Sequence, residues 1–104
     1  MTAACVVLTT SDTEANAKRI VDAVLGARLA ACVQMMPIRS FYVWQGEQRD
    51  EPEQLLLIKA RVDDYDALAA CIRAAHTYET PEIVRLDIAA GDAAYLAWLA
   101  RRGA

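Results

Sequence analysis

Segments with strand character and segments with helical periodicity alternate along this chain, and their order limits the possible folds more than any single motif does. Four runs are rich in apolar, β-branched or leucine residues and have the composition of strands: residues 4–10, 31–45, 54–62 and 82–88. Apolar residues at helical spacing lie between the first two runs, from Glu14 to about Arg28, and between the last two, from Asp63 or Asp64 to Ala75. The predicted order is therefore strand, helix, strand, strand, helix, strand.

This order is that of the ferredoxin-like βαββαβ sandwich, an α+β fold in which one antiparallel sheet carries helices on one face. A further segment begins at Asp92, a good N-cap residue, and places Tyr95, Trp98 and Leu99 on one helical face. We therefore expect an additional C-terminal helix. With 104 residues and no linker or repeat, the chain is expected to form a single domain over residues 1–104.

Local signals indicate where these elements begin and end. Ser11 and Glu14 have the spacing of a capping box before the first helix. Pro37 cannot donate to a strand ladder, so it implies a bulge or an edge position in a long, bent second strand. Residues 46–53, GEQRDEPE, have the composition of a solvated turn that joins the second and third strands as a hairpin. The second helix is expected to end at His76, the only histidine.

Charge and composition exclude several classes of partner. Lys and Arg number 11 against 14 Asp and Glu, and there is no basic run, so nucleic acid is not an expected partner. The first ten residues lack a basic segment, and their apolar run is too short for a signal peptide or a membrane span, so we expect a cytoplasmic protein with no membrane contact. The three cysteines are widely spaced among apolar neighbours, which favours reduced core residues.

Apolar residues occupy both faces of the predicted hairpin. Met35 and Met36 are adjacent and therefore point to opposite faces of the second strand, and three consecutive leucines, residues 55–57, lie in the third strand. One helix layer covers only one face of a sheet, so the other face is expected to be buried against further copies of the chain, related by closed rotational symmetry.

Five motifs in order give the chain a family resemblance: LAACV, P-x-x-S-x-Y-x-W-x-G, LLIKA, H-x-Y-x-T-P-E and YLAWL, at residues 29–33, 37–46, 56–60, 76–82 and 95–99. Over residues 6–99 the chain resembles the CutA, or divalent-cation tolerance, proteins. The resemblance implies a ferredoxin-like subunit in a homotrimer similar to PII-type signalling trimers. It also implies a non-enzymatic role in tolerance of, or response to, divalent metal ions, copper in particular.

The resemblance also allows a prediction about metal ligands. Copper-site proposals in that family use a cysteine late in the first strand and two adjacent histidines at the end of the second helix; here Thr9 and Ala75 stand at two of those positions, so only His76 remains. We therefore expect weak binding of copper or zinc by His76 with Glu79 and Glu82, with Cys32 as an additional soft ligand. Capping of the helix end by His76 is an equally good interpretation, and for Cys32 core packing is favoured.

A second hypothesis places a small anionic metabolite in a cleft between subunits, as in a PII-like sensor. Lys59 is a lone charge after an apolar run, so it needs an anionic partner such as Glu82 or a bound ligand. The expected cleft residues combine cationic, aromatic and carboxylate groups: Tyr42, Trp44, Lys59, Tyr78, Glu82 and Trp98. For Tyr42 and Trp44 the favoured role is packing between subunits. Tyr42, Lys59, His76 and Glu82 are the acid–base candidates of an enzyme, but no nucleophile motif or phosphate loop is present, so no enzyme is expected.

Overall fold

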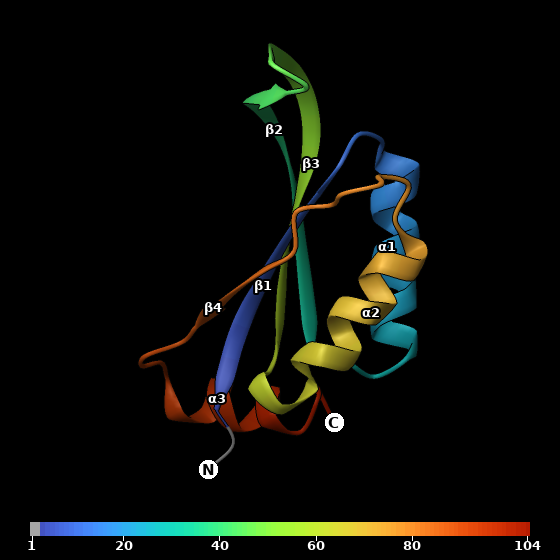
Figure 1. Cartoon of the computed structure of the whole chain (residues 1–104). Helices are drawn as coiled ribbons and strands as arrows, with labels where there is room; N and C mark the ends of the chain where they lie inside the picture. Colours follow the sequence, from blue (N-terminus) through green and yellow to red (C-terminus); the bar gives the residue numbers. More distant parts are fainter. Residues whose placement is uncertain (1–2) are drawn as a thin grey trace.

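A computed structural model describes residues 3–104 and confirms the predicted α+β, ferredoxin-like architecture. Within those residues, one antiparallel sheet has the strand order β2-β3-β1-β4, with three α-helices packed around it (Figure 1). The strands are β1 (Ala4–Ser11), β2 (Cys32–Trp44), β3 (Glu47–Arg61) and β4 (Val84–Asp87). The helices are α1 (Glu14–Gly26), α2 (Tyr65–Ala75) and α3 (Ala93–Ala100), with a 3₁₀ turn (Val62–Asp64) before α2.

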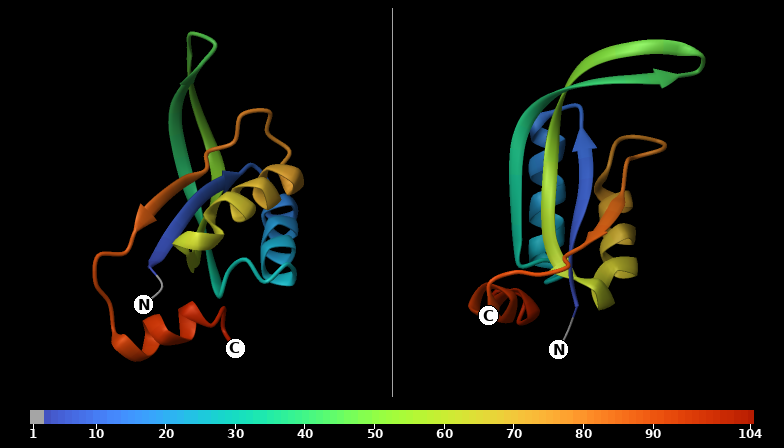
Figure 2. Two further views of the ribbon diagram at one scale, coloured as in Figure 1. Left: turned by 60° about the horizontal axis from the view of Figure 1, so that its bottom comes forward. Right: turned by 90° about the vertical axis from the view of Figure 1, so that its left-hand side faces the viewer.

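The hydrophobic core lies between one face of the sheet and the two helices α1 and α2, which lie on the same side of it (Figures 1 and 2). Alternate residues of β1 and β3 face this layer, because side chains along a strand alternate between its two faces. Val7 and Ile58 are direct register partners in the centre of the sheet, and both are fully buried. Ile20 of α1 and Leu68 of α2 cover them from the helix layer and are likewise fully buried.

The other face of the sheet, which we call the outer face, has no helix over most of its area within residues 3–104. Helix α3 crosses only the end of the sheet where β1 begins (Figure 2). The register places Leu8 of β1 between Leu57 of β3 and Val84 of β4 on this face. Leu86 is 55% exposed, Met36 47% and Val84 44%. The predicted uncovered apolar face is therefore present in the single chain.

The β2–β3 hairpin extends well beyond the end of α1 as a curved two-stranded arm (Figure 2). Its turn consists of Gln45 and Gly46, with φ angles of 53° and 79°, which is the left-handed pair of a type I′ hairpin turn. The prediction that residues 46–53 form a solvated turn is wrong, since Glu47 already pairs with Trp44 in the ladder. The charged residues at the start of β3 have the composition of a loop, although a two-stranded ribbon exposed to solvent accepts charged side chains.

Two predicted helix starts are corrected in detail. Thr13, rather than Ser11, is the N-cap of α1, and its side chain accepts a hydrogen bond from the Asn16 amide at 3.0 Å. At α2 the chain first makes its 3₁₀ turn, and Asp64 makes no capping bond. At α3 the prediction is confirmed, because the Asp92 carboxylate accepts from the Tyr95 amide.

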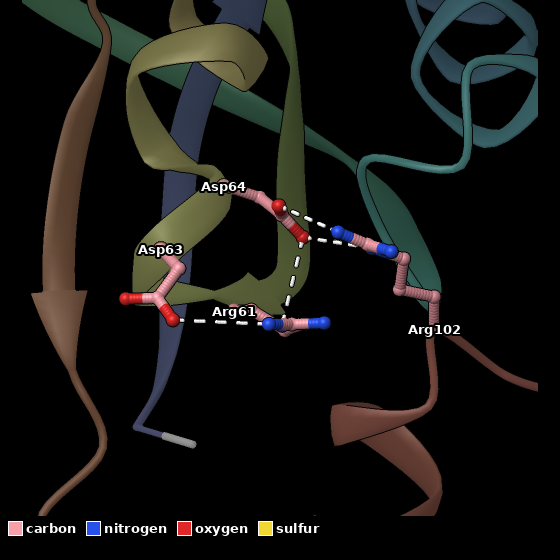
Figure 3. A network of polar contacts seen from close by, with 4 residues as sticks. All are labelled: Arg61, Asp63, Asp64 and Arg102. Carbon is pink, nitrogen blue, oxygen red and sulfur yellow. Dashed lines mark hydrogen bonds and ion pairs between the residues drawn. The ribbon is translucent and has the colours of Figure 1, made fainter.

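Asp64 instead holds the C-terminus of the chain against the body. Its two carboxylate oxygens accept from the Arg102 guanidinium, each at 2.9 Å, and Arg61 lies 3.8 Å away (Figure 3). Arg102 adopts a positive φ of 55° at the end of α3, which directs the chain back toward the sheet. This bidentate pair joins α3 to the start of α2, two elements far apart in sequence.

Candidate functional site

A hollow of about 580 Å³ lies between the β2–β3 arm and residues 77–82, the segment that leads from α2 to β4. Tyr42 and Trp44 of β2 line it from the arm, and Tyr78 lines it from the connecting segment. The charged part of the lining consists of three carboxylates: Glu53, Glu79 and Glu82. Among residues 3–104, no lysine, arginine or histidine lines the hollow, so the charged groups that line it are acidic.

His76 determines how the connecting segment leaves α2. Its side chain is 9% exposed, and Nε2 donates to the carbonyl oxygen of Thr10 in β1 at 2.6 Å. Nδ1 accepts a hydrogen bond from the Tyr78 amide at 3.0 Å, and the two rings lie 4.7 Å apart. Both ring nitrogens are therefore in use, which requires the Nε2-protonated tautomer and leaves neither nitrogen free for a metal ion.

The last carbonyl group of α2 is held by side chains of α1. The carbonyl oxygen of Ala75 accepts from Asn16 Nδ2 at 3.0 Å and from Arg19 through Nε at 3.0 Å and a terminal nitrogen at 2.6 Å. Asn16 is in turn fixed by Ser11, whose hydroxyl donates to its side-chain oxygen at 2.7 Å. These bonds satisfy a carbonyl that the helix leaves unpaired, and with His76 they fix the start of the segment that lines the hollow.

Two tyrosine–glutamate pairs lie at the hollow. The Tyr78 hydroxyl donates to Glu53 Oε2 at 2.6 Å, and the Tyr42 hydroxyl donates to Glu51 Oε2 at 3.1 Å. Burial raises the pKa of Tyr78 far above its ordinary value of 10.0, and the hydrogen bond to Glu53 adds to the effect. Loss of hydration also raises the pKa of Tyr42, together with its bond to Glu51. Both phenols therefore stay protonated and act as donors to the carboxylates.

The structure brings together only some of the predicted ligand-binding residues. Tyr42, Trp44, Tyr78 and Glu82 share the hollow, but Lys59 and Trp98 do not line it. Thr10 at the hollow pairs with Leu55, and Lys59 lies four residues further along β3, about 13 Å away.

Lys59 has a neutral partner, since its ammonium group donates to Gln34 Oε1. Neither Glu82 nor any other carboxylate forms an ion pair with Lys59 among the described residues. Trp98 lies on α3, where its ring packs near Gly103 at the opposite end of the molecule from the arm (Figure 1).

The predicted metal ligands are also separated. Cys32 is the register partner of Lys59 and lies at the far end of the sheet from His76, while Glu79 and Glu82 lie at the hollow. Residues 3–104 contain no group of three or more histidine, cysteine or acidic side chains arranged to hold a metal ion. The donor set therefore does not fit a tight, soft copper site, which needs several thiolate or imidazole ligands. The exposed carboxylates of the hollow fit weak, oxygen-based binding of a hydrated cation.

Sequence reasoning missed Glu53 as a site residue. The predicted solvated turn includes it, whereas it lies in β3, is only 7% exposed and lines the hollow. The available signal is its strand parity with Leu55 and Leu57, which extends the third strand toward the arm.

Comparison with known proteins agrees with this geometry. The family model for the CutA1 divalent ion tolerance protein matches residues 5–102. The chain belongs to this family. A divalent-cation tolerance protein CutA from Yersinia pestis is 43% identical over 97 residues, which cover 92% of this chain and 82% of the relative. The solved structure of the divalent cation tolerance protein from Thermus thermophilus superposes with a TM-score of 0.92 at 41% identity, covering 97% of this chain and 99% of that one.

One CutA relative corrects the predicted location. The CutA structure from Archaeoglobus fulgidus, with a TM-score of 0.93 and 29% identity over 97% of this chain and 99% of that one, is described as periplasmic. The prediction of a cytoplasmic location is therefore wrong. It relies on the composition of the first ten residues and on the cysteines, and the presence of free thiols does not restrict a fold to one compartment. Within residues 3–104, no helix has both the length and the apolar character needed to cross a membrane.

Proposed function

We propose that this protein serves in the response to divalent metal ions as a non-enzymatic homotrimer that binds such ions weakly at the hollow. The ligands we propose are the carboxylates of Glu79 and Glu82, both exposed at the rim. The observation that carries the proposal is the lining of the hollow, in which every charged side chain among the described residues is a carboxylate. Such a site attracts cations and disfavours anions.

The proposal leaves out His76 and Cys32. Both nitrogens of His76 already have hydrogen-bond partners, and Cys32 lies at the other end of the sheet. With two carboxylates and no imidazole or thiolate, the ion keeps most of its water ligands, so binding is expected to be weak and shared by copper, zinc and harder ions.

The homotrimer is proposed from the outer face of the sheet. Exposed apolar side chains on β2 and β4, among them Met36, Val84 and Leu86, would remain in water in a monomer, and closed rotational symmetry allows several copies to bury them. Light scattering tests this part, with an expected mass of three times the 11.4 kDa chain. A monomer mass at micromolar concentration would contradict it.

We do not advance the PII-like metabolite-sensing alternative. It depends on Lys59 as an anion-binding residue next to the aromatic groups, and Lys59 instead donates to Gln34 about 13 Å along β3 from the hollow.

Calorimetric titration of metal-free protein with zinc(II) and copper(II) tests the metal proposal. We expect saturable binding with a Kd of about 10⁻⁴ to 10⁻³ M, as for weak oxygen-ligand sites. The double variant Glu79→Gln/Glu82→Gln should bind at least about tenfold more weakly. The control Glu14→Gln/Asp66→Asn removes two exposed carboxylates from the helices and should leave the Kd unchanged. Equal affinity of the rim variant and the unmodified protein would exclude these ligands.

A further inference from the structure

Glu53 is a buried carboxylate that has no cationic partner within residues 3–104. Glu53 is 7% exposed, and it lines the hollow. The only hydrogen bond that its side chain makes within those residues comes from the Tyr78 hydroxyl at 2.6 Å. None of the ion pairs in the described part of the chain includes Glu53.

Burial of such a group is costly, because acidic side chains are almost never buried unless a cation or several donors offset the lost hydration. One neutral phenol supplies only part of that compensation. The nearby charges do not supply the rest. Asp12 is negatively charged like Glu53, and Arg49, which forms an ion pair with Glu47 at 3.4 Å, forms none with Glu53. The charge of Glu53 is therefore only partly compensated within residues 3–104.

The walls beside Glu53 are aromatic. Tyr42 and Trp44 are two residues apart in β2, so they share one face of the arm, and Tyr78 approaches from the connecting segment. Aromatic faces attract organic cations, ammonium groups among them, and they are not ligands for metal ions. The arm already shows this preference in a second place, where the Arg39 guanidinium lies 5.6 Å from the centre of the Phe41 ring.

We propose that the hollow binds an organic ammonium ion, a protonated amine on an apolar chain, with Glu53 as its counter-ion and the rings of Tyr42, Trp44 and Tyr78 around the chain. A divalent metal ion is a poor match for this position, since it needs several oxygen ligands and Glu53 is a single carboxylate already bonded to Tyr78. A hollow of about 580 Å³ has the size of a small-molecule pocket, far larger than a metal ion requires. The ligand class and the central residue differ from those of the metal site at the rim.

Pentan-1-amine is a suitable probe, because it is protonated at neutral pH and pentan-1-ol is its uncharged counterpart. Calorimetry with the full chain should show saturable binding of the amine and none of the alcohol. Proton NMR of the bound amine should show upfield shifts of its methylene groups, caused by the surrounding rings. Glu53→Gln should weaken binding at least about tenfold, because it removes the charge and keeps the acceptor for Tyr78.

Three further variants separate this site from general attraction to an acidic protein. Trp44→Leu changes an exposed ring and should weaken amine binding about two- to fivefold. Asp66→Asn, which removes an exposed carboxylate from α2, should leave the Kd within about twofold. Glu79→Gln/Glu82→Gln should lose metal affinity and keep amine binding within about threefold, so the two proposals can fail independently.

Two results would overturn the inference: no saturable binding of pentan-1-amine up to about 10 mM, or equal affinity for the amine in Glu53→Gln, Asp66→Asn and the unmodified protein. Circular dichroism establishes that each variant is folded. Should Glu53→Gln fail to fold, Trp44→Leu and the ring-induced shifts decide the question, and an unchanged Kd together with unshifted methylene signals would contradict the proposal.

Discussion

The imidazole of His76 joins the end of α2 to β1, because Nε2 donates to the carbonyl oxygen of Thr10 at 2.6 Å. The same ring accepts the Tyr78 amide through Nδ1. The only histidine of the chain thus holds, from both sides, the start of the connecting segment that carries Glu79 and Glu82.

His76→Ala is expected to lower the free energy of unfolding by about 2–3 kcal/mol, because it leaves a buried carbonyl and a backbone amide without partners. Urea unfolding monitored by circular dichroism measures the change. Arg73→Ala, an exposed residue in the last turn of α2, is the control and should change stability by less than about 0.5 kcal/mol. A loss at His76 no larger than that of the control would show that its two bonds contribute little.

Asp64 should make stability depend on acidic pH. Its hydrogen bonds to Arg102 hold the pKa of the carboxyl below the ordinary value of 3.8. A carboxyl whose pKa is lowered in the folded state contributes stability that is fully present above its unfolded pKa and is lost as the pH falls through its folded pKa.

Unfolding free energies of the unmodified protein and Asp64→Asn, measured from pH 7 to pH 2.5, test this contribution. We expect the two proteins to differ by about 1 kcal/mol at pH 7, a value reduced by the partial exposure of Arg102. The difference should begin to shrink as the pH falls below about 4 and should be lost as it passes through the lower pKa of the folded state. A difference that stays constant over the whole range would contradict the linkage.

The outer face of the sheet provides a test of assembly. Leu86→Asp places a charge on β4 at an exposed apolar position, and it should shift the mass observed by light scattering toward the monomer. Leu25→Asp makes the same change on α1, on the helix side of the molecule, and should leave the mass unchanged. Equal masses for both variants and the unmodified protein would exclude the outer face as the interface between copies.

The turn of the arm has a strict conformational requirement. Gly46 has a φ of 79°, where a Cβ atom is unfavourable although no neighbouring atom lies within 4 Å of the position it would occupy. Gly46→Ala should therefore cost about 1 kcal/mol through backbone strain alone. Gly26→Ala is the matched control, since it lies in α1 with equal space and without a positive φ, and urea unfolding should show no loss. A neutral Gly46→Ala would show that the turn adopts another conformation.

Hydrophobic periodicity and helix signals are sufficient to predict the fold. The alternation of runs with strand composition and runs with helical periodicity indicates the order of elements, and the Asp92 cap and the end of α2 at His76 lie where predicted. Predicted boundaries fail where a tertiary contact competes with a local signal. Asp64 pairs with Arg102 instead of capping α2, a choice that depends on a residue 38 positions away. In the arm, charged residues of β3 resemble a loop, because a two-stranded ribbon does not need alternating apolar residues.

The candidate site is predictable only in part. Tyr42, Trp44, Tyr78 and Glu82 are brought together as expected, since the motifs that carry them flank the same end of the sheet. Lys59 is predicted to lie with them only because its charge suits an anionic ligand. The strand register shows that it lies further along β3. The roles of His76 and Glu53 depend on a carbonyl oxygen of β1 and on a phenol of the connecting segment, and sequence patterns do not specify such contacts.

The central claim, that divalent ions meet carboxylates while His76 is structural, is tested most directly by the nitrogen spectrum of the imidazole. Because the chain has one histidine, a two-bond ¹H–¹⁵N correlation spectrum contains a single pair of ring nitrogen signals. We predict the pattern of the Nε2-protonated tautomer, unchanged when zinc(II) is added to saturation. A shift of either ring nitrogen to a metal-bound position would contradict the account and identify His76 as a ligand.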